Sequence, residues 1–226
     1  IYRYGAARMS GFWSDVTVYG PGFLTAAWTV LWLTLVTIVL SWVFGLAAAL
    51  GQRSDQSWVR AIAAFYVWFI RGTPALIQIF IIYFGMPQVG MRLTPYTAGI
   101  LALAINSGAY VTEIIRSGLT AIPNGQMESS LALGFSRRET MLTIILPQVF
   151  RIILPSVTNE ALSTLKNTSL LSTITVVELT LYAQTLISAT FRPFDFYIAV
   201  AVIYLLLTTF LTQLAAYFER RFARLY

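Results

Sequence analysis

Residues 23–50 read FLTAAWTVLWLTLVTIVLSWVFGLAAAL, an apolar run that contains no charged side chain. About 20 such residues cross the hydrocarbon core of a membrane as a helix, whereas runs of about 10–14 are more typical of buried helices in soluble proteins. The 226-residue chain around this run is 58% hydrophobic and 11% charged, against about 25% charged in ordinary soluble domains. Its mean hydropathy is +0.73. The sequence therefore predicts an integral membrane protein built from spanning helices.

Four further apolar stretches are long enough to cross a bilayer, which predicts five transmembrane helices in one all-α domain over residues 23–218. The expected spans are residues 23–50, 58–84, 96–116, 152–177 and 196–218. The second is interrupted by Gly72-Thr73-Pro74, and the fourth is unusually polar. Residues 1–22 mix aromatic and polar side chains, which predicts an external interfacial segment. Residues 219–226 form a basic tail.

Lysine and arginine counts between the spans predict the orientation. Nine lie in segments 51–60, 116–151 and 219–226, and four lie in the segments on the opposite side. Because cytoplasmic loops carry the excess of positive charge, the segment 116–151 and the C-terminus are expected in the cytoplasm. Five spans then place the N-terminus on the outer side of the membrane.

Composition also limits the chemistry. The chain has no cysteine and no histidine, which removes thiolate metal sites, the commonest metal ligand and the commonest general base. The net charge of +6 is explained by membrane orientation rather than by nucleic-acid binding. The sequence therefore predicts a protein that is not an enzyme and that holds no metal or other cofactor.

Polar side chains inside the expected spans are candidates for function, because ionisable groups there are costly. In the fourth span they form two adjacent stripes that make one wide polar face. The candidate substrate-binding residues are Glu160, Thr73, Gln78, Asn106, Tyr110, Asn159, Ser163, Thr164, Lys166 and Asn167. On the functional interpretation, Glu160 binds an ammonium or cationic group, and side-chain donors bind a carboxylate. On the structural alternative, Glu160 pairs with Lys166 or Arg71 and the amides bridge helices.

The cytoplasmic segment 121–147 predicts a compact helix–turn–helix. Pro123 blocks continuation of the third span, and Asn124 is a suitable N-cap for a short helix. Gly134 fits the left-handed position that closes such a helix. Ser136 and Glu139 then have the spacing of a capping box. The second helix is expected to end at Leu146, before Pro147, and Met127 and Leu131 are expected to form an exposed apolar knob.

The run ESSLALG at residues 128–134, followed by IILP at residues 144–147, resembles the "EAA…G…I.LP" signature of ATP-binding-cassette importer permeases. Ser129 and Ser130 replace the usual two alanines, and both remain small. The stretch RGTP at residues 71–74 resembles the polar amino acid permeases of the histidine, arginine, glutamine and cystine type. So do AYVTEIIR at residues 109–116 and LKNTSL at residues 165–170. The resemblance extends from residue 23 to residue 221.

This resemblance implies the fold and mechanism of a type I importer permease. The cytoplasmic segment would dock on a separate ATPase, which carries ATP and magnesium, while a periplasmic binding protein delivers a polar or charged amino acid. The chain itself lacks the G-x-x-x-x-G-K-[ST] motif of nucleotide-binding loops. The coupling residues implied are Gln126, Glu128, Leu131, Ala132, Gly134, Phe135 and Arg137. Two permease halves are implied, and the second is either the same chain or a paralogue.

Two other classes remain as alternatives. A secondary transporter or channel would be expected to have internal repeats, and the five unequal spans have none. A membrane-embedded enzyme would need catalytic groups that the composition does not supply. The segment 172–195 is open to two interpretations, an external gate or an ordinary connecting helix. The sequence leaves the identity of the amino acid open.

Overall fold

The computed structural model describes residues 2–223, with side chains over residues 15–221, and this part of the chain is helical without a strand. The elements in chain order are α1 (Tyr2–Gln52), α2 (Ser57–Gly72), α3 (Ala75–Phe80), η1 (Ile81–Gly85), η2 (Met86–Val89), α4 (Pro95–Thr120), α5 (Asn124–Ala132), α6 (Arg137–Thr140), η3 (Met141–Ile145), α7 (Leu146–Asn167), η4 (Thr168–Ile174), α8 (Leu179–Thr190) and α9 (Pro193–Ala223). The predicted all-α fold is confirmed.

Four stretches are single helical runs long and apolar enough to span a membrane: Asp15–Gln52, Pro95–Thr120, Arg137–Ile174 and Pro193–Arg221. A fifth crossing exists if α2 and the helical stretch Ala75–Val89 count as one span, and these two are bent by 113°. The predicted interruption at residues 72–74 is therefore a sharp change of direction. Its cause is Pro74, which has no N–H to continue the helix of α2.

The central contact of the fold joins α1 to α4. Gly45 and Gly108 let the two backbones approach, since a Cβ at Gly45 would lie 2.5 Å from Val111 and one at Gly108 would lie 2.7 Å from Phe44. The buried Thr112 hydroxyl donates to the carbonyls of Gly108 at 2.9 Å and Gly45 at 3.2 Å. Helices in membranes usually associate through small residues and interhelical hydrogen bonds, because the hydrophobic effect does not drive them together in lipid.

The expectation that a helix ends before Pro147 is wrong. Helical structure continues from Arg137 through α6, η3 and α7, so the helical run that contains the predicted fourth span begins well before residue 152. Residues Met141–Ile145 form a π-helical turn, in which the Leu146 N–H bonds to the Met141 carbonyl. Such a widened turn leaves room for the proline ring, and Pro147 lies in the first turn of α7, where its missing N–H costs little.

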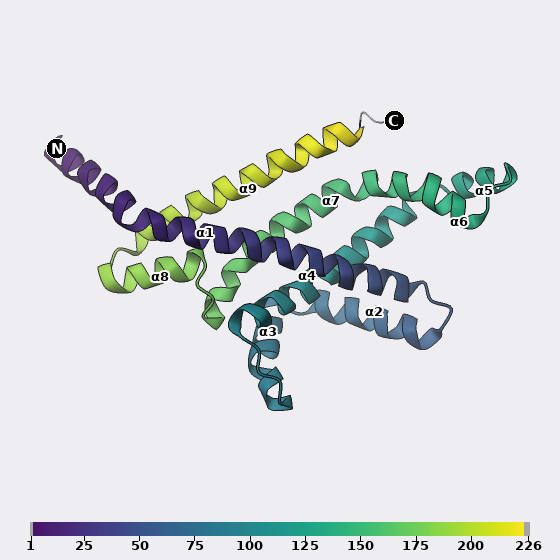
Figure 1. The fold of residues 1–226 in the computed structure, drawn as a ribbon, viewed down its shortest axis with the longest axis horizontal. Helices are drawn as coiled ribbons and strands as arrows, with labels where there is room; N and C mark the ends of the chain where they lie inside the picture. Colours follow the sequence, from purple (N-terminus) through teal and green to yellow (C-terminus); the bar gives the residue numbers. More distant parts are fainter. Residues whose placement is uncertain (1, 224–226) are drawn as a thin grey trace.

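The two ends of the molecule are formed by different helices. Figure 1 shows α5 and α6 at one end of the long axis, and α8 with the N-terminal turns of α1 at the other. At the α8 end, Arg192 forms ion pairs with Asp15 at 2.7 Å and with Asp195 at 2.8 Å. These contacts join the start of α9 to α1.

Glu178 is a fully buried carboxylate at the start of α8. It accepts hydrogen bonds from the backbone N–H groups of Thr180 and Leu181, each at 2.9 Å, and from the Tyr204 hydroxyl of α9 at 3.0 Å. Burial raises the pKa of the Glu178 carboxyl, and its hydrogen-bond donors act in the opposite direction. The short helix expected within residues 172–195 is confirmed as α8, and Glu178 attaches it to α9.

The predicted divisions at residues 22 and 219 stay predictions. Helix α1 runs without interruption from Tyr2 to Gln52, so the backbone of residues 2–22 continues the first span. The side chains of residues 1–14 lie outside the described residues, as do residues 224–226 of the basic tail. Helix α9 continues through the start of that tail to Ala223.

Candidate functional site

The bend between α2 and α3 is held by the side chain of Gln78. Its amide nitrogen donates to the carbonyls of Ile70 at 2.8 Å and Thr73 at 3.1 Å, and to the Thr73 hydroxyl at 2.7 Å. The Asn106 amide of α4 donates to the Gln78 side-chain oxygen at 2.9 Å. The structure thus brings together three predicted site residues and satisfies backbone groups that the break would otherwise leave unpaired.

A second polar cluster joins α4 to α7. Ser107 donates to Glu160 Oε1 at 2.8 Å, and Thr164 donates to Ser107 at 3.2 Å. Ser107 and Thr164 are buried, and Glu160 is half-buried. Glu160 forms no ion pair among the described residues, so the alternative pairing with Lys166 or Arg71 is wrong. The reason is geometric, because the Ser107 hydroxyl of α4 occupies the position next to the carboxylate.

Ser107 was missed by sequence reasoning. A serine in an apolar span is common, and its partner Glu160 lies 53 residues away along the chain. No local pattern could indicate their contact.

The remaining predicted substrate residues have varied exposure. Asn159 and Lys166 are exposed, Ser163 and Asn167 are half-buried, and Tyr110 is 36% exposed. The polar face of the fourth span is therefore divided. Glu160 and Thr164 face α4, while Asn159 and Lys166 face outward from the chain. Their role in substrate binding stays a prediction.

A charged cluster that was not among the predicted site residues lies beside Tyr110. Glu113 forms ion pairs with Arg116 at 2.8 Å and with Arg71 at 3.3 Å, and the Arg71 guanidinium lies 5.5 Å from the centre of the Tyr110 ring. The side chains of Arg71 and Arg116 are 43% and 57% exposed. Charged groups in a span avoid lipid, so this face of α2 and α4 is suited to a water-filled path or a protein partner.

The segment 121–147 has most of the predicted local structure. Gly134 has φ +90°, the left-handed conformation expected of it. The Ser136 hydroxyl accepts from the Glu139 N–H at 3.2 Å, and Glu139 accepts from the Ser136 N–H at 2.8 Å, which confirms the capping box. One detail is wrong: Pro123 occupies the N-cap position in extended backbone, and Asn124 is the first helical residue.

The exposed apolar surface of this segment differs from the prediction. Met127 packs against the buried cluster Ile145, Val149 and Ile153, so it faces inward. The outward side chains are Leu133, 78% exposed, and Phe135, 41% exposed, on either side of Gly134. Met127 turns inward because the buried Ser130 and Thr140 hydroxyls, 2.8 Å apart, hold α5 against α6. We name Leu133, Gly134 and Phe135 the coupling turn, and Leu133 is a candidate that the sequence reasoning missed.

The other predicted coupling residues surround this turn on the surface. Gln126, Glu128, Ala132 and Arg137 are exposed, and Leu131 is half-buried. An exposed apolar pair with a polar rim is typical of a protein-docking surface.

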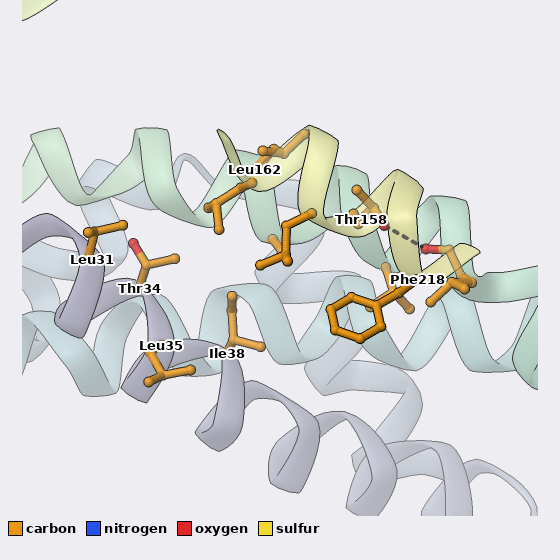
Figure 2. A pocket seen from close by; sticks show the side chains of 13 residues that line it. Leu31, Thr34, Leu35, Ile38, Thr158, Leu162 and Phe218 are labelled. Atoms are coloured by element: carbon orange, nitrogen blue, oxygen red, sulfur yellow. Dashed lines mark hydrogen bonds between the residues drawn. The ribbon is translucent and has the colours of Figure 1, made fainter. Parts of the chain in front are cut away.

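A groove of about 390 Å³ lies between α1, α7 and α9. Figure 2 shows Leu31, Leu35, Ile38, Leu162 and Phe218 around it. None of the predicted substrate residues lines this groove, and its apolar walls are suited to lipid chains rather than to a polar solute. Among the described residues, no group of three or more acidic side chains could hold a metal ion.

A family model described as "Binding-protein-dependent transport system inner membrane component" matches residues 41–224. The chain belongs to this family. The match covers every span after the first, the coupling turn and the polar clusters of α4 and α7. The predicted resemblance to importer permeases is confirmed.

Curated relatives support the same assignment. The glutamine transport system permease protein GlnP of Escherichia coli is 37% identical over 212 residues, which cover 92% of this chain and 96% of GlnP. The L-cystine transport system permease protein TcyB of Bacillus subtilis is 35% identical over 85% of this chain and 82% of its own.

Among solved structures, a chain from a crystal structure of an amino acid ABC transporter with histidines superposes with a TM-score of 0.87. It is 39% identical in sequence, and the match covers 92% of this chain and 97% of that one. The predicted fold of a type I importer permease is confirmed.

Proposed function

We propose that this chain is the permease subunit of an ATP-driven importer for a polar or charged amino acid in the bacterial inner membrane. The observation that carries the proposal is the coupling turn, an exposed apolar pair at one end of a bundle of spanning helices. A docking surface there fits a separate ATPase, because the chain itself has no nucleotide-binding motif. ATP and magnesium belong to that partner.

The arrangement of α5 to α7 supports mechanical coupling. Helical structure continues from α6 through η3 into α7, the helix that carries Glu160 and Thr164. A force on the coupling turn would therefore move α7 directly, without a flexible connection. The hydrogen-bond pattern of this run changes at the π-helical turn Met141–Ile145, and such turns frequently lie at functional sites.

The charge distribution supports the orientation. The coupling turn lies on the side that carries nine of the arginines between spans, which favours the cytoplasm. The C-terminal end of α9 is on that side as well. The N-terminal turns of α1 and helix α8 are then periplasmic, where a binding protein would deliver the substrate.

The polar cluster of Ser107, Glu160 and Thr164, which we name the Glu160 cluster, supports a substrate path between α4 and α7. A carboxylate at membrane depth that is paired only with hydroxyl groups can attract an ammonium or guanidinium group. Tyr110, Asn159, Ser163, Lys166 and Asn167 remain candidates along the accessible surface. Gln78, Asn106 and Thr73 already bond to one another, so we assign them mainly to holding the bend that borders the path.

The relatives support the substrate class. GlnP is named for glutamine and TcyB for cystine, both polar amino acids. A second permease subunit, either identical or a paralogue, would complete the path, because the charged face of α2 and α4 needs cover within the membrane.

The proposal is tested by transport in proteoliposomes that contain this chain, its co-purified ATPase and a binding protein. Radiolabelled glutamine, cystine, arginine and histidine are supplied outside, with ATP or a non-hydrolysable analogue inside. We expect accumulation of at least one amino acid that requires ATP hydrolysis. Accumulation that follows an ion gradient without ATP would instead establish the secondary-transporter alternative.

A further inference from the structure

Besides the apolar groove, a pocket with a polar wall lies where α1 and α4 end, on the side of the coupling turn. Its volume is about 290 Å³. Its lining residues are Ala49, Gln52 and Arg53 at the end of α1, and Ile115, Arg116, Leu119 and Thr120 near the end of α4. None of them belongs to the coupling turn or to the Glu160 cluster. We name this the arginine pocket.

The arginine pocket has guanidinium donors available for an anion. Arg116 uses Nε and Nη2 for Glu113, at 3.0 and 2.8 Å, and the structure records no partner for its Nη1 among the described residues. The exposed side chain of Arg53 likewise has no recorded hydrogen bond or ion pair within residues 15–221. Gln52 adds an uncharged donor to the same wall, whereas the Thr120 hydroxyl already donates to the Arg116 carbonyl at 2.9 Å.

The surrounding charges leave a positive excess. The acidic groups nearby are Glu113, which Arg71 and Arg116 share, and Asp55 in the loop after α1. Arg60 points into that loop, since it donates to the carbonyls of Ser54 at 2.7 Å and Asp55 at 2.9 Å. The positive groups near the pocket are four arginines and the negative groups are two carboxylates, which favours an anionic ligand. These residues are Arg53, Arg60, Arg71 and Arg116, with Asp55 and Glu113.

The other wall of the pocket is apolar. Ala49 and Ile115 are buried in one hydrophobic cluster, with Leu119 packed against it. Leu46 and Leu50 are exposed on the adjacent part of α1, at 46% and 70%. Helices α1 and α4 both end here and are long and apolar enough to span a membrane, so we expect the arginines at their ends to lie near the membrane surface. A free anion would use only the polar wall, whereas a lipid uses both.

We propose that the arginine pocket binds the phosphate headgroup of an anionic phospholipid, with an acyl chain against Leu46 and Leu50. Basic pockets between spanning helices at the membrane surface are suited to such headgroups, and guanidinium groups bind phosphate oxygens in pairs. The arginine pocket shares Arg116 with the charged face of α2 and α4, whereas Arg53 lines the pocket and has no part in that face. The lipid would fix the ends of α1 and α4 relative to each other, beside the α4–α5 connection that leads to the coupling turn.

The test measures lipid retained by the full chain purified from membranes with any subunits that accompany it. Protein is equilibrated with phosphatidylglycerol in phosphatidylcholine nanodiscs and bound phosphatidylglycerol is counted by native mass spectrometry. Arg53→Gln should weaken retention of one phosphatidylglycerol about five- to tenfold, and Arg53→Lys should weaken it less. The control is Arg138→Gln, an exposed arginine of α6 outside the pocket, which should retain lipid like the wild type.

Three results would overturn the proposal. The first is equal retention by wild type and Arg53→Gln. The second is an equal loss in Arg53→Gln and Arg138→Gln, which would indicate general attraction of basic residues to an anionic surface. The third is displacement of phosphatidylglycerol by about 10 mM inorganic phosphate, which would indicate a site for a free anion.

Discussion

The coupling turn and the Glu160 cluster are built in opposite ways. The coupling turn is exposed, and its shape comes from bonds between residues a few positions apart, such as Ser136 with Glu139. The Glu160 cluster is largely buried, and its bonds join residues 53 and 57 positions apart. The first is therefore a surface that a partner can bind without rearrangement. The second depends on how α4 and α7 pack, so it changes whenever those helices move.

The largest effect is expected from removing the charge of Glu160. Glu160→Gln keeps the shape and the bond from Ser107, but it loses the attraction for an ammonium or guanidinium group. We expect the KM for transport to rise about 10- to 100-fold, which corresponds to the loss of one hydrogen bond to a charged group. Uptake kinetics in proteoliposomes measure this. Asp55→Asn, at an exposed carboxylate outside the spans, is the control, and an unchanged KM in Glu160→Gln would make its role purely structural.

The bend between α2 and α3 should depend on Gln78. Gln78→Leu removes the donor to Ile70 and Thr73 and leaves the Asn106 amide without its acceptor. Buried polar groups that lose their partner cost about 1–3 kcal/mol each, so the free energy of unfolding should fall by about that amount. Thermal unfolding in detergent measures it. Gln213→Leu, an exposed glutamine of α9, should be close to neutral, and equal stability of both variants would contradict this account of the bend.

The role of the exposed coupling turn in docking is tested at Leu133. Leu133→Ala removes apolar surface from a side chain that is 78% exposed, so we expect the fold to remain intact while affinity for the ATPase falls about five- to thirtyfold. Binding of the detergent-solubilised ATPase gives the measurement. Leu206→Ala, 63% exposed on α9, is the matched control, and an equal response of the two variants would remove Leu133 from the docking surface.

The contrast between the two regions also explains what the sequence could predict. The left-handed Gly134, the capping box and the break at Pro74 all follow from local chemistry. The contacts of Ser107 with Glu160 and of Asn106 with Gln78 depend on tertiary packing, which no periodicity reveals. Leu133 was missed because the rotation of α5 depends on the Ser130–Thr140 contact. Pro147 was misread as a helix end because a π-helical turn accommodates it.

The smallest expected effect is a pH dependence that originates at Glu178. Because burial raises its pKa in the folded chain, this carboxyl stabilises the fold fully below its unfolded pKa of about 4.3 and loses that contribution as pH rises through the folded value. We expect the stability of wild type relative to Glu178→Gln to decline as pH increases from about 4. Thermal unfolding of both chains across this range measures the difference, and a constant difference would contradict the burial effect.

The most direct test of the central claim compares two glycines with nearly the same backbone. Gly134 in the coupling turn has φ +90°, Gly90 after η2 has φ +86°, and neither has an atom within 4 Å of an added Cβ. Gly134→Asp and Gly90→Asp therefore carry the same strain at different places. The readout is ATP hydrolysis stimulated by the substrate-loaded binding protein in proteoliposomes. We predict that Gly134→Asp abolishes stimulation and ATPase binding while Gly90→Asp retains both, and normal activity of a folded Gly134→Asp would contradict the assignment of the coupling turn.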